Sequence, residues 1–295
     1  MAKTAQSITF FRILGIALLI VGCIGFFHGW GQIQSETLLV LTFHGVMDNP
    51  GKPWEISFGE LVEKIHGLKR YGFEALPPED FQRWWGGELS GGRHFLVTFD
   101  DGLLTSGTAI KKLKTDEGIR PILFVVTDLM GKPGYLGADD LRELASGSGC
   151  AFGLHGKTHE EPPKVIKAGR DLAEELRSAK SVLEAIVGKT ISMYAYPFGE
   201  FDPDSKDAVA SAGITFGFTI ESRAIDRGND ALLLPRLMYL RGVEAVGEPT
   251  ISDWMPPREA RLGGLTLTLA MFVFLLALRM FIRAAELSRQ KSKKT

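Results

Sequence analysis

The sequence predicts an α/β protein with a mostly parallel sheet or barrel and one hydrophobic segment near each end of the chain. Short apolar, β-branched runs alternate with amphipathic helical patterns along the middle of the 295 residues, which is typical of βα units. Several runs stop at polar residues, and the ends of strands are where α/β folds carry their chemistry. Periodicity alone does not distinguish an open sheet from a closed barrel.

The expected elements follow one another from residue 38. Ser57 with Glu60 forms a capping-box pattern that starts a helix, and Gly72 suits its end. Asp171 with Glu174 forms a second such pattern. Strands are expected at 38–43, 95–99, 121–127, 150–154, 190–196, 214–220 and 232–240. Helices are expected at 58–71, 110–114, 138–146, 172–187 and 203–212.

The two hydrophobic segments near the ends predict membrane anchoring. The first contains the run 13–27 and follows Lys3 and Arg12, and the second is the run 262–278, which precedes a basic tail. Both are about long enough to span a bilayer. The positive-inside rule then places both termini in the cytoplasm, although Arg258 and Arg261 weigh slightly against this. No cleavage site follows the first run convincingly, so a retained span is favoured over a cleaved signal peptide.

These signals divide the chain into four expected parts. A cytoplasmic stub and transmembrane helix occupy 1–30, the α/β domain 31–257, a second transmembrane helix 258–282 and a basic cytoplasmic tail 283–295. The α/β domain is expected outside the inner (cytoplasmic) membrane. The net charge of −1 gives no basic excess for nucleic acid. Cys23 and Cys150 lie far apart in the chain and form no disulfide framework.

Paired polar residues end two of the expected strands. Asp100 and Asp101 follow the apolar run 95–99, and adjacent carboxylates repel each other unless a cation or a proton compensates them. A surface Asp-Asp-Gly turn is the simplest alternative. His155 and His159 follow the run 150–154 at a spacing that lets both reach one cation. An Asp-His-His set leaves a position open for water, as in catalytic zinc sites.

Together these motifs resemble the polysaccharide deacetylase family, that is, the NodB homology domain or carbohydrate esterase family 4. The family's Thr-Phe-Asp-Asp motif stands at 98–101, and its His-(Ser/Thr)-x-x-His motif stands at 155–159 with Gly156 in place of the hydroxyl residue. Its third motif ends in Pro-Phe-Gly at 197–199. The resemblance covers 38–239 and implies a distorted (β/α) barrel with seven strands. His44 follows the first strand, and the poly-N-acetylglucosamine branch of the family has a similar histidine at this place.

The resemblance implies a role for each motif residue. Asp101, His155 and His159 would bind a divalent metal, zinc by default and cobalt or nickel as options. A bound metal lowers the pKa of water toward ~7. Asp100 would be the general base, and the backbone N–H of Phe198 would stabilise the oxyanion.

The sequence departs from the family at two points. Many members hold the base with an arginine before the proline of the third motif, where this chain has Ala195 and Tyr196. Arg236 is the candidate replacement, and a surface or structural ion pair is an equal alternative. Many members also use a late histidine as general acid, but no histidine follows residue 159. His44 is the candidate acid, as the resemblance to the poly-N-acetylglucosamine branch implies.

The expected function is that of a membrane-anchored, metal-dependent hydrolase that removes N-acetyl groups from an extracytoplasmic glycan, with a poly-N-acetylglucosamine-like exopolysaccharide favoured. A deacylase of a lipid-linked sugar or an O-acetyl ester stays open within the same chemistry. A non-catalytic glycan-binding scaffold on the same fold is the alternative from another class. The expected partners are the glycan and the lipid bilayer. Trp84 and Trp85 could stack on sugars, but core packing is favoured.

Overall fold

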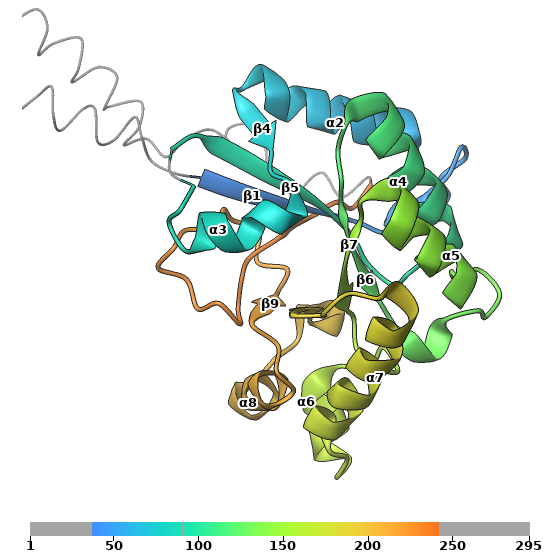
Figure 1. The fold of residues 1–295 in the computed structure, drawn as a ribbon, viewed down its shortest axis with the longest axis vertical. Coiled ribbons are helices and arrows are strands. Elements are labelled where there is room, and N and C mark those ends of the chain that lie inside the picture. The colour runs from blue at the N-terminus through green and yellow to red at the C-terminus, as the bar shows by residue number, and fades with distance from the viewer. Residues whose placement is uncertain (1–36, 90, 242–295) are drawn as a thin grey trace, which may run out of the picture. The chain divides into compact units, whose positions relative to one another are not determined.

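The computed structural model describes residues 37–89 and 91–241 (Figure 1). Both expected membrane spans lie outside these ranges. Within them, no helix combines the length and the apolar character that crossing a bilayer requires.

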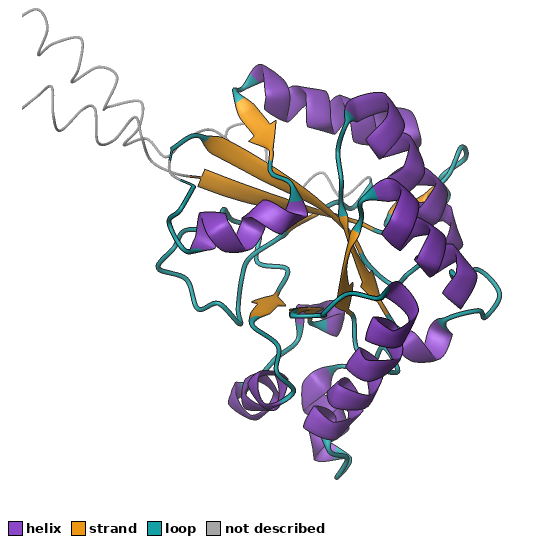
Figure 2. Ribbon diagram, in the orientation of Figure 1, coloured by secondary structure: helices purple, strands orange, loops and turns teal. Residues whose placement is uncertain are grey.

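Parallel strands form the centre of the α/β part of the chain, and helices cover the sheet from outside (Figure 2). The strands β1 (Thr37–Phe43) and β5 (Arg93–Phe99) are the longest, and they pair in parallel along their whole length. A separate small sheet consists of β2 (Gly45–Val46) and β3 (Glu55–Ile56). The order of the main sheet is β10 (Leu237–Met238), β1 (Thr37–Phe43), β5 (Arg93–Phe99), β6 (Ile122–Val125), β7 (Ala151–Leu154), β8 (Met193–Ala195) and β9 (Phe216–Phe218), with β4 (Phe73–Ala75) paired to β5.

The segment before β10 links the two ends of this strand order. Leu234 forms backbone hydrogen bonds with β9 and the residue after it: Leu234 N donates to Gly217 O at 2.7 Å, and Thr219 N donates to Leu234 O at 2.8 Å. A few residues later, Leu237 pairs with Leu41 of β1. The result is a strongly curved parallel half-barrel that is consistent with the expected seven-stranded architecture.

Side-chain caps start the main helices where the sequence indicates. Ser57 Oγ accepts a hydrogen bond from Glu60 N, and the Glu60 carboxylate accepts one from Ser57 N, which confirms the predicted capping box. Asp171 caps Glu174 N, but only this half of the second predicted box forms in the described chain. The helices are α2 (Phe58–Arg70), α3 (Phe81–Trp85), α4 (Leu104–Glu117), α5 (Ala138–Glu143), α6 (Pro162–Lys167), α7 (Leu172–Val187) and α8 (Pro203–Ser211).

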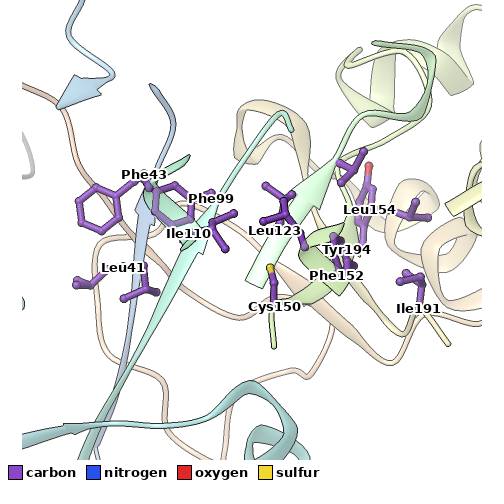
Figure 3. Close-up of a cluster of buried hydrophobic side chains, with 14 of the residues drawn as sticks. Leu41, Phe43, Phe99, Ile110, Leu123, Cys150, Phe152, Leu154, Ile191 and Tyr194 are labelled. Atoms are coloured by element: carbon purple, nitrogen blue, oxygen red, sulfur yellow. The ribbon is translucent and has the colours of Figure 1, made fainter. Parts of the chain in front are cut away.

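The buried side chains form two clusters on opposite faces of the strands. Leu41 and Phe43 belong to the cluster that packs under the helices, part of which Figure 3 shows with Phe99 and Leu123. Their neighbours along β1, such as Val40, belong to the second cluster, as the two-residue period of a strand requires. Trp84 is fully buried in that second cluster, which confirms core packing for this residue.

Several predicted boundaries were wrong because tertiary packing decides them. The helix expected at 110–114 runs from Leu104 to Glu117, and the strand expected at 232–240 keeps only Leu237 and Met238. Pro235 lies in the lost part and has no N–H to donate to a ladder. The strands expected at 190–196 and 214–220 shrink to β8 and β9. The short elements β2, β3, β4, α3 and α6 have no periodic signal in the sequence.

Candidate active site

The motif residues meet at the carboxyl edge of the parallel strands. Asp100 and Asp101 follow β5, His155 follows β7, Phe198 lies just after β8, and His44 follows β1. All five line one cavity of about 670 Å³. The rest of its lining is mostly apolar, and it includes Met47, Trp54, Leu103, Tyr135, Tyr196, Ile220, Met238 and Leu240.

One carboxylate oxygen and two imidazole nitrogens form a compact cluster in this cavity. Asp101 Oδ1 lies 3.4 Å from His155 Nε2 and 3.2 Å from His159 Nε2. Ligand atoms ~2.1 Å from a tetrahedral divalent ion are ~3.4 Å apart. Asp101 Oδ1 is buried and has no hydrogen-bond partner among the described residues. The three side chains therefore fit a divalent cation.

The backbone fixes which nitrogen of His155 faces this cluster. His155 Nδ1 lies 2.9 Å from the carbonyl oxygen of Ala195 and can only donate to it, so Nε2 keeps its lone pair for the cluster. Burial lowers the pKa of His155 below its ordinary value, although the charges of Asp100 and Asp101 act in the opposite direction. The imidazole is thus held in the neutral form that a metal ligand needs.

Backbone strain is concentrated at the same place. In the described chain, the non-glycine residues with positive φ are Asp101 at 71°, His159 at 67° and Phe198 at 60°. Such conformations persist only where the surroundings enforce them, and they cluster at functional sites. Gly156 has a φ of 83°, which explains why this position carries glycine instead of the hydroxyl residue of the second motif.

The second carboxylate, Asp100, is held by a buried arginine. Arg236 Nη1 and Nη2 donate to Asp100 Oδ1 and Oδ2, each at 2.8 Å. Arg236 is fully buried, donates from Nε to Thr219 O at 3.0 Å, and lies over the ring of Phe124. Burial raises the pKa of Asp100, but the charges of Arg236 and His155 outweigh it and hold the pKa well below its ordinary range. Asp100 is therefore ionised, and the ion pair with Arg236 is not a surface contact.

Two further residues proposed from the sequence lie in the cavity wall. His44 is half-buried, and its Nδ1 is a buried atom without a hydrogen-bond partner in the described chain. The ring of Phe198 is 56% exposed and lies 4.8 Å from that of His159. Gly199 N and Glu200 N bond to the preceding carbonyls of Tyr196 and Pro197, whereas no hydrogen bond of the described residues uses the N–H of Phe198.

Two aromatic residues of the cavity lining, Trp54 and Tyr135, were not predicted from the sequence as part of the site. Trp54 comes from the loop between β2 and β3, and Tyr135 comes from a loop that pairs with Leu103. The signal available for Trp54 was an aromatic residue at the end of the Pro- and Gly-rich loop that follows His44.

Comparisons with known proteins agree with this geometry. Residues 89–217 match the family model described as polysaccharide deacetylase. A Staphylococcus aureus protein named poly-beta-1,6-N-acetyl-D-glucosamine N-deacetylase is 22% identical over 202 residues, which cover 63% of this chain and 68% of the relative.

Solved structures show the same fold. IcaB from Ammonifex degensii gives a TM-score of 0.65 at 24% identity, covering 76% of this chain and 98% of that one. BC0361, a polysaccharide deacetylase from Bacillus cereus, gives 0.61 at 23% identity, covering 76% and 69%. The matched range 89–217 contains both aspartates and both histidines of the site. Residues 89–217, which carry the site, therefore form a domain similar to the polysaccharide deacetylases.

Proposed function

We propose that this protein is a metal-dependent deacetylase that hydrolyses the N-acetyl groups of N-acetylglucosamine units in an extracytoplasmic glycan. The observation that carries the proposal is the arrangement of the two neighbouring carboxylates. Asp100 is kept ionised by buried Arg236, while Asp101 faces His155 and His159 at distances that fit a divalent ion. A base and a metal site thus lie side by side at one cavity.

The chain's own groups account for the proton transfers of amide hydrolysis. A zinc, cobalt or nickel ion held by Asp101, His155 and His159 would supply electrophilic activation of water and of the amide carbonyl. Asp100 would accept the proton of the attacking water. The N–H of Phe198 would donate to the developing oxyanion. His44 would give a proton to the nitrogen of the leaving amine as the C–N bond breaks.

Arg236 determines how Asp100 can act as a base. The bidentate contact fixes the plane of the carboxylate and keeps it deprotonated. The arginine is in turn fixed by Thr219 O and by Thr98 Oγ1, at 3.0 Å and 3.4 Å. Arg236 therefore takes the place that the arginine of the third motif has in many family members.

The glycan is proposed from the relatives and the location from the ends of the chain. The Staphylococcus aureus relatives are named as deacetylases of poly-beta-1,6-N-acetyl-D-glucosamine, so a similar polymer is the favoured substrate. The apolar runs 13–27 and 262–278 would hold the α/β domain at the outer side of the inner membrane. Deacetylation there would expose amines and make the polymer cationic.

The apolar lining of the cavity favours a second substrate class. Met47, Met238 and Leu240 line it together with the site, and such side chains suit the hydrocarbon part of a lipid-linked sugar. A membrane-anchored enzyme would meet such a substrate at the bilayer. An O-acetyl ester would use the same groups, since only the leaving atom differs.

An acetate-release assay on the full chain in detergent tests the proposal. The protein is freed of metal by a chelator and then supplied with zinc, cobalt or nickel, and acetate is measured with β-1,6-linked N-acetylglucosamine oligomers. Metal-restored release that is lost in Asp100→Asn and His44→Ala supports the proposal. His66→Ala is the matched control, because His66 pairs with Glu117 at the surface and does not line the cavity. Acetate release from lipid-linked or O-acetylated sugars alone would move the assignment to those substrates.

A further inference from the structure

One large aromatic side chain stands at the cavity without a role in the hydrolysis. Trp54 is 43% exposed and lines the same cavity as Asp101 and His159. Exposed aromatic groups beside a concave site are where ligands gain contact area. By contrast, Trp84 is fully buried and cannot meet a ligand.

The loop that carries Trp54 is fixed from within by a buried carboxylate. Glu55 is 7% exposed, and its Oε2 accepts hydrogen bonds from Gly51 N at 2.8 Å and from Lys52 N at 2.9 Å. Hydrogen bonds from backbone N–H to a carboxylate are among the strong ones. The bond from Gly51 N lowers the pKa of Glu55 most, and together with the bond from Lys52 N it outweighs the opposite effect of burial, so the anchor stays charged.

The same loop is also held from outside. Arg241 donates from its backbone N to Pro53 O at 2.5 Å and from Nη1 to Pro50 O at 2.6 Å. On the cavity side, β2 and β3 pair at Gly45 with Glu55 and at Val46 with Ile56. Trp54 therefore sits on a braced loop, and little conformational entropy remains to be lost when a ligand packs against it.

One face of the indole is already in use. Lys52 Nζ lies 5.4 Å from the centroid of the Trp54 ring, within the range of a cation–π contact. Lys52 also lines the cavity, so a ligand that stacks on this face of the ring must displace the ammonium group.

We propose that Trp54 is a stacking platform for a second sugar ring of the glycan, next to the unit whose acetyl group is hydrolysed. This inference rests on the proposed function and adds a preference for chain length to it. A β-linked glucosamine ring exposes a face of axial C–H groups, which removes apolar area from water when it packs on an aromatic ring. A monosaccharide bound at Asp101 and the histidines leaves the platform empty, whereas an oligomer fills it.

The test compares an oligomer of N-acetylglucosamine with the monosaccharide in the full chain supplied with metal. Trp54→Ala is expected to lower kcat/KM for the oligomer by about tenfold more than for the monosaccharide, as loss of one aromatic contact implies. The change should lie in KM, since the reacting groups are untouched, and Trp54→Tyr should restore most of it. Val182→Ala is the control, because Val182 is equally exposed at 45% but does not line the cavity.

A binding measurement separates this proposal from the proposed function. Calorimetric titration of the chelated full chain with the oligomer does not depend on turnover, and Trp54→Ala should weaken binding by about tenfold. If the unsubstituted protein releases no acetate but the binding difference holds, the platform stands and the deacetylase assignment fails. If Trp54→Ala and Val182→Ala bind the oligomer equally well, the platform is wrong whatever the activity.

Discussion

The two adjacent carboxylates of the site are compensated in opposite ways. Asp100 is fully buried and shares both oxygens with the buried guanidinium of Arg236. Asp101, next in the chain, has no arginine or lysine partner among the described residues, and its Oδ1 faces Nε2 of His155 and Nε2 of His159. The charge of Asp100 is compensated by the guanidinium of Arg236, whereas compensation of Asp101 would need a cation that is not part of the protein, such as a metal ion.

Under the proposed function, this difference would give each carboxylate a different role. A carboxylate held by a fixed arginine remains ionised and keeps its orientation, as a general base must. A carboxylate that faces two imidazoles and no arginine or lysine would be compensated by a bound metal ion. The turn at Asp101, with a φ of 71°, sends the two side chains of the pair to these separate surroundings.

The largest effect is expected from replacing Arg236. Arg236→Met leaves the Asp100 carboxylate buried without a partner, which is expected to lower the free energy of unfolding by about 3–5 kcal/mol and to abolish activity. Urea unfolding of the full chain in detergent measures the loss.

A double substitution distinguishes the effect of an unpaired buried charge from general packing damage. Asp100→Asn combined with Arg236→Met removes both charges, so the double variant should be more stable than Arg236→Met alone. A double variant that is less stable by the sum of the two single losses would show that the two side chains do not interact as a pair.

Metal removal is expected to affect the site at Asp101, His155 and His159 alone. At a metal concentration of about 100 times the dissociation constant, zinc should stabilise the protein by about 2.7 kcal/mol over the chelated form. Asp101→Asn should abolish this difference, because one of the three ligands is lost. Thermal unfolding with and without chelator measures it. The same zinc-dependent gain in Asp101→Asn would place the metal elsewhere.

A smaller effect is expected from restoring the family's hydroxyl residue in the second motif. Gly156→Ser places a β-carbon on a residue with a φ of 83°, which should cost about 1 kcal/mol of stability. The space itself is adequate, since the nearest atom to an added β-carbon is Pro197 Cγ at 3.4 Å.

Gly147→Ser is the matched control for this substitution. Gly147 has no positive φ, and nothing lies within 4 Å of an added β-carbon. Chemical denaturation should therefore show a loss for Gly156→Ser and almost none for Gly147→Ser. Equal stabilities of the two variants would mean that the loop after His155 relaxes to another conformation.

The strands that carry the site could be predicted from the sequence, because their signals are local. The runs that become β1, β5 and β7 are apolar and end at His44, at the Asp pair and at His155. The contact between Asp100 and Arg236 joins residues 136 positions apart, so no local pattern specifies it. Trp54 was overlooked for a related reason: its place at the cavity depends on the pairing of β2 with β3 and on Arg241.

Cys150 shows how burial changes the pKa of an acidic group that has no arginine beside it. Both Cys150 and Asp100 are fully buried, and burial raises the pKa of both. Only Asp100 has a cation close enough to reverse the shift. The pKa of the Cys150 thiol is raised from 9.0 to about 12, so the folded protein keeps it neutral when the unfolded chain ionises.

The smallest predicted effect follows from this shift. Because the folded pKa is the higher one, the stability that the neutral thiol contributes is complete below pH 9 and is lost as the pH rises toward 12. Between pH 7.5 and 9.5, this ionisation should lower the free energy of unfolding by about 0.8 kcal/mol. In Cys150→Ala the packing loss is the same at both pH values, so the decrease over that interval should be smaller by this amount. Urea unfolding at the two pH values tests this, and an unchanged decrease would show that burial does not hold the thiol neutral.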